Sequence, residues 1–200
     1  MGCEIPLCLD KLPQLSEVFI RKSHSVLVHR TLSQLSNLSC LQILKLQFSD
    51  SPNEDLLICQ LPKLTNVKLL ELRVFGKRGA SLLPLTPVIE ACPCLQSFVF
   101  EMILPWKMLC TQREPKRVVG PPHQHLKEVE FHNYYGQPCE LELVNYLIDN
   151  AIALEKLVVN PCDEEYFSDL DELKKVMEPR ERALQQLNGK LSSRIELVIN

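Results

Sequence analysis

Glycine is scarce in this sequence, with 6 residues in 200, which argues against the Gly-rich loops that hold nucleotide phosphates. Neither sign of charge dominates, and the net charge of −3 gives no general attraction to nucleic acid or to an anionic membrane. No apolar run approaches the ~20 residues of a membrane-spanning helix, and no basic segment precedes an apolar run as in a secretory signal. We therefore expect a soluble chain of the cytoplasm or nucleus that binds neither nucleic acid nor membrane.

The nine cysteines are an odd number, and no secretory signal accompanies them. A disulfide framework is unexpected in a reducing compartment. Free thiols that pack as small buried hydrophobic groups are therefore the favoured interpretation.

Leucine is abundant, with 36 residues. Five leucines recur at a spacing of three: Leu32, Leu35, Leu38, Leu41 and Leu44. An α-helix would spread these five over about 240° of its circumference, so they do not form one helical stripe. From Leu44 the spacing changes to two, through Leu46 and Phe48, which indicates a strand. The combined pattern, L-x-x-L followed by L-x-L, is typical of the strand segment of a leucine-rich repeat.

The same phrase occurs six times along the chain, and a weaker seventh copy ends it. The central residues of the seven copies are Val18, Leu44, Leu70, Phe98, Val129, Leu157 and Ile195. Successive centres are 26, 26, 28, 31, 28 and 38 residues apart. The early intervals lie close to the ~20–29 residues of such repeats, and the long last interval predicts an inserted element.

These repeats predict an α/β fold, a single leucine-rich-repeat solenoid over residues 1–200 that is curved like a horseshoe. About six to seven short strands would form a parallel sheet on the concave side, with helices and loops on the convex side. Residues 9–104 would hold the irregular leucine-rich repeats. Residues 105–122 have no apolar period, so we expect an exposed loop there, and a functional loop and a disordered loop both stay open.

Three helical segments are predicted between the strand phrases. The first has Thr86 as N-cap and Pro87 at its first position. The second has apolar residues at i, i+3, i+4 and i+7, namely Val144, Leu147, Ile148 and Ala151. The third is a helical pair at about 168–188, broken or kinked at Pro179, which ends at Asn188 and Gly189 and lengthens the last repeat.

Two segments resemble a known plant family. Residues 91–98, Ala-Cys-Pro-Cys-Leu-Gln-Ser-Phe, resemble the C-P-x-L-x-x-L phrase of plant F-box proteins with irregular leucine-rich repeats. Residues 125–157 hold a strand phrase, a glycine, a helix ending in Asn-Ala and the next strand phrase. This order is similar to the FBD region of that family, so the resemblance implies FBD-like C-terminal repeats over residues 123–200, including the inserted helices.

The resemblance implies a protein-interaction module, similar to the substrate-recognition part of an F-box type ubiquitin-ligase receptor. The partner would be a protein substrate of unknown identity. A Skp-type adaptor would bind only through an F-box, and no segment of this sequence matches one, so we expect the C-terminal part of a longer protein or a truncated relative. The alternative is a remnant or decoy of the F-box family that recruits no ligase.

Strand alternation predicts which side chains would meet a partner. The leucines of each L-x-L phrase point inward, so the residues between and beside them face outward on the concave side. The candidate binding residues are Phe19, Arg21, Lys45, Gln47, Glu71, Arg73, Glu101, Glu128, Glu130, His132, Lys156 and Asn160. The acidic stretch around Glu101, Glu128 and Glu130 makes a basic segment of the partner conceivable.

No arrangement of residues predicts catalysis, a metal or a cofactor. Cys92-x-Cys94 with His123-x-His125 has ligand residue types, but the cysteine spacing is one short of the usual zinc knuckle. The acidic run at 163–165 does not follow the calcium-loop pattern. A Cys139–His132 pair has no motif to orient it, and the basic residues near Trp106, namely Lys107, Arg113, Lys116 and Arg117, fit a flexible loop better than a phosphate site.

Overall fold

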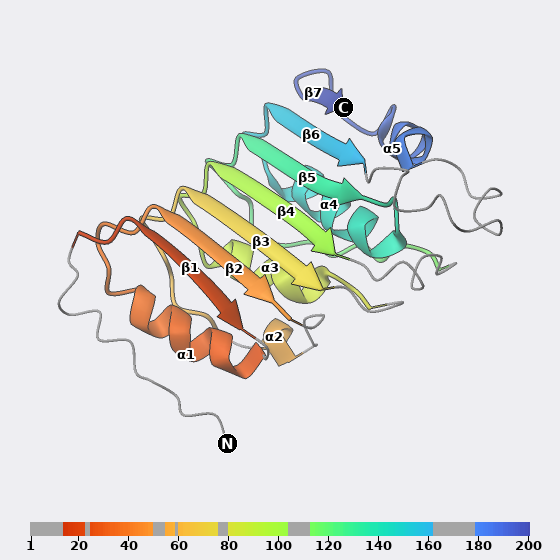
Figure 1. Cartoon of the computed structure of the whole chain (residues 1–200). Helices are drawn as coiled ribbons and strands as arrows, with labels where there is room; N and C mark the ends of the chain where they lie inside the picture. Colours follow the sequence, from red (N-terminus) through yellow and green to blue (C-terminus); the bar gives the residue numbers. More distant parts are fainter. Residues whose placement is uncertain are drawn as a thin grey trace.

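The computed structural model describes residues 14–22, 25–49, 55–58, 60–75, 80–103, 113–161 and 179–200. Seven strands form one sheet in chain order, and each strand is parallel to the next (Figure 1). They are β1 Glu17–Lys22, β2 Ile43–Phe48, β3 Leu69–Phe75, β4 Ser97–Ile103, β5 Glu128–Tyr134, β6 Lys156–Pro161 and β7 Glu196–Ile199. The predicted α/β class and parallel sheet are confirmed.

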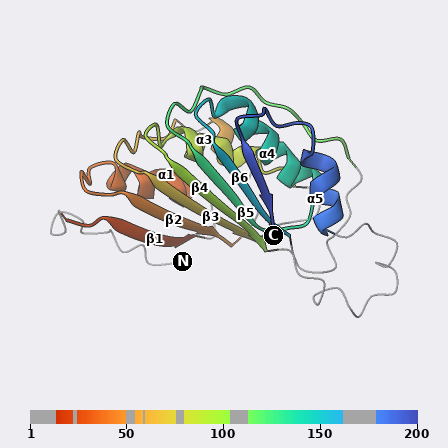
Figure 2. The same cartoon turned by 90° about the horizontal axis from the view of Figure 1, so that it is seen from above.

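Helices lie on one side of this sheet. They are α1 Ser25–Leu35, α2 Asp55–Ile58, the 3₁₀ helix η2 Leu83–Leu85, α3 Thr86–Glu90, α4 Pro138–Asn150 and α5 Pro179–Leu187. Figure 2 shows α1, α3 and α4 along the same face of the sheet, and no described element covers the opposite face. Among the described helices, none has the length and apolar character that crossing a bilayer requires.

The three-residue spacing of leucines comes from consecutive tight turns. The N–H of Leu38 donates to the carbonyl of Leu35 over 3.0 Å, and the N–H of Leu41 donates to Leu38 over 3.4 Å. Turns closed by i→i−3 bonds place side chains three apart on the same side, here toward the core. Leu32 and Leu35 precede these turns and lie in α1, a helix that the leucine spacing did not predict.

The turn is repeated before the later strands. Bonds of the same kind join Val67 to Leu64, Leu95 to Cys92, Leu154 to Ala151 and Ile195 to Ser192. These turns directly precede β3, β4, β6 and β7.

Six of the seven predicted centres lie side by side in the sheet. Val18, Leu44, Leu70, Phe98, Val129 and Leu157 are successive register partners. The seventh prediction is wrong by two residues, because Leu157 pairs with Leu197 rather than with Ile195. Ile195 occupies the turn position that Leu154 holds in the preceding copy, and one residue fewer separates that turn from the strand centre.

The middle helices match their predictions closely. Val144 and Leu147 are buried on α4, and Ala151 is the C-cap. Thr86 is the first residue of α3 and not its N-cap, which is Leu85. The 3₁₀ turn of η2 runs directly into α3, so the backbone is already helical at Thr86.

Only part of the predicted insertion falls within the described residues. Residues 162–178, which include the first predicted helix and the acidic run at 163–165, lie outside them. The second helix is α5, in which Pro179 is the first residue rather than an interruption. Proline is tolerated there because the first N–H of a helix has no intrahelical acceptor. The predicted stop at Gly189 is observed, with φ +81°.

Candidate interaction surface

The twelve predicted candidate residues all lie on the face of the sheet opposite the helices, which we call the sheet face. Their positions alternate with buried core residues along each strand, as in β2, where Leu44, Leu46 and Phe48 are buried and the residues between them are half-buried. Phe19, with 57% of its surface exposed, is the most exposed large apolar residue of this face.

Strand pairing orders these side chains into three rows across the sheet. The Glu17 row contains Glu17, Ile43, Leu69, Ser97, Glu128, Lys156 and Glu196. The Phe19 row contains Phe19, Lys45, Glu71, Val99, Glu130, Val158 and Val198. The Arg21 row contains Arg21, Gln47, Arg73, Glu101 and His132, where a register shift in β5 ends it.

An alternating chain of carboxylates and cations crosses β1 to β4. Lys45 Nζ lies 2.7 Å from Glu17 and 3.8 Å from Glu71. Arg73 Nε lies 2.8 Å from Glu71 and 3.1 Å from Glu101. The hydrogen bond to Glu17 raises the pKa of Lys45. Each of these two cations is thus shared by two carboxylates that come from different strands.

The alternation stops at β5. On β5 the residue that bonds to Glu101 is an amide and not a cation: Asn133 Nδ2 donates to Glu101 over 3.1 Å. Glu130 accepts a hydrogen bond of 2.8 Å from Asn160 Nδ2 and lies 3.2 Å from His132 Nε2. Among the described residues, no lysine or arginine forms an ion pair with Glu130.

The two halves of the sheet face therefore differ in charge. On β1 to β3 the three rows carry two carboxylates and three cations. On β4 to β7 they carry four carboxylates, with Lys156 as the one lysine or arginine and His132 as the one histidine. Lys156 is also only loosely paired, 3.6 Å from Glu128.

A second group of polar contacts fixes residues 113–123, which we call the strap, to α4. The side chain of Glu142 is buried and accepts hydrogen bonds from Ser81 Oγ at 2.6 Å, Arg113 Nη2 at 3.0 Å and the Lys116 N–H at 2.9 Å. Arg113 Nη1 donates as well, so the guanidinium is bidentate. Burial alone would raise the pKa of Glu142, but the donors lower it overall.

The far end of the strap is held by the end of α4. The N–H of Gly120 donates to Asn150 Oδ1 over 3.0 Å, and the N–H of His123 donates to the Asn150 carbonyl over 2.8 Å. A Cβ on Gly120 would come within 2.7 Å of the Tyr146 ring, so only glycine fits this approach. Tyr146 in turn donates to Glu90 over 2.9 Å.

These contacts refine the prediction of an exposed loop at 105–122. Residues 104–112, with Trp106 and Lys107, lie outside the described part of the chain. Residues 113–122 contain no helix or strand, and 114–119 are exposed, yet the strap is bonded to α4 at both ends. Arg117 lies 3.6 Å from Asp149, so two of the predicted basic residues already have carboxylate partners.

The turn between β5 and α4 is clamped from α5. Arg182 Nη1 donates to the Tyr135 carbonyl over 2.8 Å, and Gln186 Nε2 donates to the Gly136 carbonyl over 3.0 Å. Inside the turn, the fully buried Glu140 accepts the N–H groups of Tyr135 and Gln137. Burial raises the pKa of Glu140 to about 8.

The residues considered for metal binding do not converge. Cys92 is buried and its Sγ donates to the Val88 carbonyl over 3.6 Å, while His123 packs edge-on against Tyr146. Cys94 and His125 line a shallow polar groove beside the turns that precede the strands. Within the described ranges, no group of three or more His, Cys, Asp and Glu residues could hold a metal.

The Cys139–His132 pair is also separated. His132 lies on the sheet face, whereas Cys139 lies on α4 on the other side of the sheet. Burial raises the pKa of Cys139 to about 12, so its reactive thiolate form is scarce at neutral pH.

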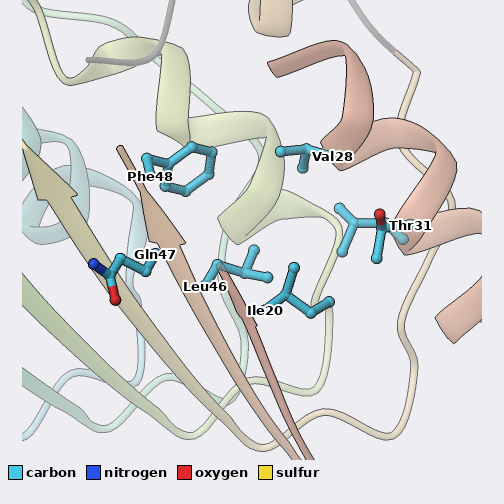
Figure 3. Close-up of a pocket in the computed structure, with 7 residues that line it drawn as sticks. Ile20, Val28, Thr31, Leu46, Gln47 and Phe48 are labelled. Atoms are coloured by element: carbon cyan, nitrogen blue, oxygen red, sulfur yellow. The ribbon is translucent and has the colours of Figure 1, made fainter. Parts of the chain in front are cut away.

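A small apolar cavity lies between α1 and the first two strands. Figure 3 shows Ile20 and Leu46 from the sheet and Val28 and Thr31 from α1 around it, with Phe48 closing one side. No charged residue lines this cavity, so it offers no polar group to orient a ligand.

In the comparisons with known proteins, one family model matches a segment of the chain. The family model FBD matches residues 114–159, a stretch that comprises most of the strap together with β5, α4 and the first four residues of β6. A search of curated proteins and a search of solved structures found no match. The FBD part of the resemblance seen in the sequence is thereby confirmed.

Proposed function

We propose that this chain is the substrate-recognition part of an F-box type ubiquitin-ligase receptor and that it works in the cytoplasm or nucleus. Its strands and turns would form a leucine-rich-repeat solenoid, and its partner would be a protein. The observation that carries this proposal is the sheet face, where three ordered rows of side chains are covered by no described element.

The repeating geometry supports the solenoid. Each strand pairs in parallel with the next along the chain, and the same i→i−3 turn precedes five of them. Stacked units of this kind present extended surfaces that bind partners. The FBD match supports the link to F-box proteins, because FBD is an F-box-associated family.

The dimensions of the sheet face suit an extended segment of a partner. Seven strands at ~4.8 Å spacing span ~29 Å, which is the length of about nine extended residues. The ion pairs along β1 to β4 hold the side chains in place before binding, so less side-chain freedom would be lost on association. We propose recognition, and no catalysis, as the role of this surface.

Site-specific photo-crosslinking in the full chain would test the proposal. We expect a benzophenone amino acid at Val99, on the sheet face, to capture one discrete protein in cells. The matched control is the same group at Gln185, an exposed residue of α5. Equal capture from both positions, or none from Val99, would contradict recognition by the sheet face.

Precipitation of the native protein from cells, with an antibody raised against residues 179–200, separates the receptor from its alternatives. A Skp-type adaptor would bind only through an F-box, so an adaptor and a cullin in that precipitate support a ligase receptor. A crosslinked partner without adaptor in the native precipitate indicates a decoy that occupies substrate, and the absence of both indicates a remnant.

A further inference from the structure

Glu130 occupies an unusual place on the sheet face. It lies in the Phe19 row between Val99 on β4 and Val158 on β6. Neighbouring strands are ~4.8 Å apart, so the two valines form apolar walls on either side of the carboxylate. Its side chain keeps 31% of its surface exposed, so the open side faces solvent.

The carboxylate is held in position by an amide and an imidazole, and no described lysine or arginine pairs with it. Asn160 Nδ2 donates to Oε1 over 2.8 Å, and His132 Nε2 lies 3.2 Å away. Asn160 is itself braced at 3.4 Å from His132 Nδ1 and by a bond from Asn200. A carboxylate with a fixed orientation and free lone pairs is prepared to accept further hydrogen bonds.

The chain itself shows which group fits between carboxylates on this face. Lys45 bridges Glu17 and Glu71, and Arg73 bridges Glu71 and Glu101. Continued across β5, the alternation would place another cation beside Glu130. That place is taken by His132, and among the described residues no lysine or arginine pairs with Glu130. Of the carboxylates in the two neighbouring rows, Glu101 is paired with Arg73 at 3.1 Å and Glu128 only loosely with Lys156 at 3.6 Å.

We propose that Glu130 is the centre of a subsite that binds an arginine side chain of the protein partner. This inference rests on the proposed function of the sheet face and names the partner's chemistry. A guanidinium pairs with a carboxylate through two parallel hydrogen bonds, and its methylene stem packs on apolar walls such as Val99 and Val158. An acidic partner segment would be repelled by the surplus of carboxylates on β4 to β7.

Peptide titration of the full, isotope-labelled chain tests this inference by NMR. The probe is a capped nine-residue peptide of serine, threonine and alanine with a single central arginine. The matched control peptide has citrulline, the uncharged isostere of arginine, at the central position. We expect chemical-shift changes centred on β4 to β6 and at least ~10-fold weaker binding of the citrulline peptide, since a fixed charge pair is worth roughly one decade of affinity.

Two variants locate the effect. Glu130→Gln removes the charge and is expected to reduce arginine binding to the level of citrulline. Glu155→Gln is the matched control, because this substitution removes the same charge. Glu155 lies directly before β6, outside the three rows, and pairs with Lys127 at 2.9 Å. Thermal melting confirms that both variants are folded.

The outcomes are distinct. Equal binding of the two peptides, unchanged binding by Glu130→Gln or an equal loss with Glu155→Gln would each overturn the arginine subsite. If the arginine peptide fails while Val99 still crosslinks a partner, recognition by the sheet face stands and this inference falls. If both fail, the proposed function falls with it.

Discussion

The buried Glu142 holds one end of the strap to α4. Glu142 has a fully buried side chain, and Arg113 is the cation that compensates it, with 24% of its own side chain exposed. Removing one partner of a buried ion pair leaves the other charge without compensation. The sequence places Glu142 beside apolar residues of a helix without indicating that it would be buried.

We expect Arg113→Gln to lower the free energy of unfolding by about 3 kcal/mol, because the buried Glu142 loses its bidentate partner. The matched variant Arg117→Gln is expected to change it by less than about 0.5 kcal/mol, since the Arg117–Asp149 pair is exposed to solvent. Urea unfolding of both variants measures the difference. Equal effects would show that the strap is not anchored through Glu142.

The buried Glu140 makes stability depend on pH. Its pKa in the folded chain is about 8, above the ~4.3 of an exposed glutamate. The folded state therefore binds more protons, so this group favours folding below pH ~4.3 and loses that contribution as the pH rises toward 8. His123, whose pKa burial lowers, acts in the opposite direction at mildly acidic pH.

Comparison with Glu140→Gln isolates this contribution, because His123 is present in both proteins. We expect the unfolding free energy of the unmodified chain to fall more steeply between pH 5.5 and pH 8 than that of the variant. Denaturant titrations at several pH values give both slopes. Parallel slopes would mean that Glu140 is ionised in the folded chain.

At the scale of elements, the β5–α4 turn depends on contacts from α5. Gly136 has φ +69°, and an added Cβ would overlap Cδ of Arg182 and lie 2.8 Å from its Cγ. Gly189 has φ +81°, but nothing lies within 4 Å of an added Cβ. The two glycines thus share a backbone conformation and differ in crowding.

We expect Gly136→Ala to destabilise the chain by more than about 2 kcal/mol, because strain and displacement of Arg182 add together. Gly189→Ala is expected to cost about 1 kcal/mol from backbone strain alone. Thermal denaturation of the two variants compares them directly. A smaller destabilisation by Gly136→Ala would show that Arg182 and α5 can move aside without loss of stability.

The elements also show what sequence patterns can predict. The period of two placed β1 to β6 correctly, because side-chain alternation is a local property of each strand. The weak last copy was misplaced, since Ile195 and Leu197 are both apolar and only the turn bond to Ser192 distinguishes them.

The contacts of the strap were beyond prediction for a different reason. Glu142 is bonded to Ser81 and Arg113, which are 61 and 29 residues away in the sequence. The local spacing of residues cannot predict contacts between such distant positions. The residues of the sheet face could be predicted because they follow from alternation, whereas the bond from Asn160 to Glu130 joins residues 30 apart in sequence.

At the scale of the whole molecule, the FBD segment is not self-contained. Glu142 bonds to Ser81, Tyr146 bonds to Glu90, and β5 pairs with β4. On the other side, β6 pairs with β7, and α5 clamps the β5–α4 turn. All of these partners lie outside residues 114–159.

We therefore expect a fragment of residues 114–159 to be unfolded in isolation, while residues 80–200, which restore these partners, keep a cooperative thermal transition. Units in such arrays are stabilised by their neighbours and bury too little surface alone. Circular dichroism and amide proton dispersion distinguish the two states. A cooperatively melting 114–159 fragment would show that the family match marks an independent domain.

The chain order of the sheet has a consequence for how this surface can change over generations. Each strand pairs only with its neighbours in chain order, and the same i→i−3 turn precedes five of the seven strands. Duplication of one unit such as residues 43–68 would therefore insert an eighth strand without disturbing the others. Every row would grow by one side chain, and the duplicated Lys45 would bring a new charge into the Phe19 row. The width of the binding surface and its charge pattern can therefore evolve in whole steps, one copied unit at a time.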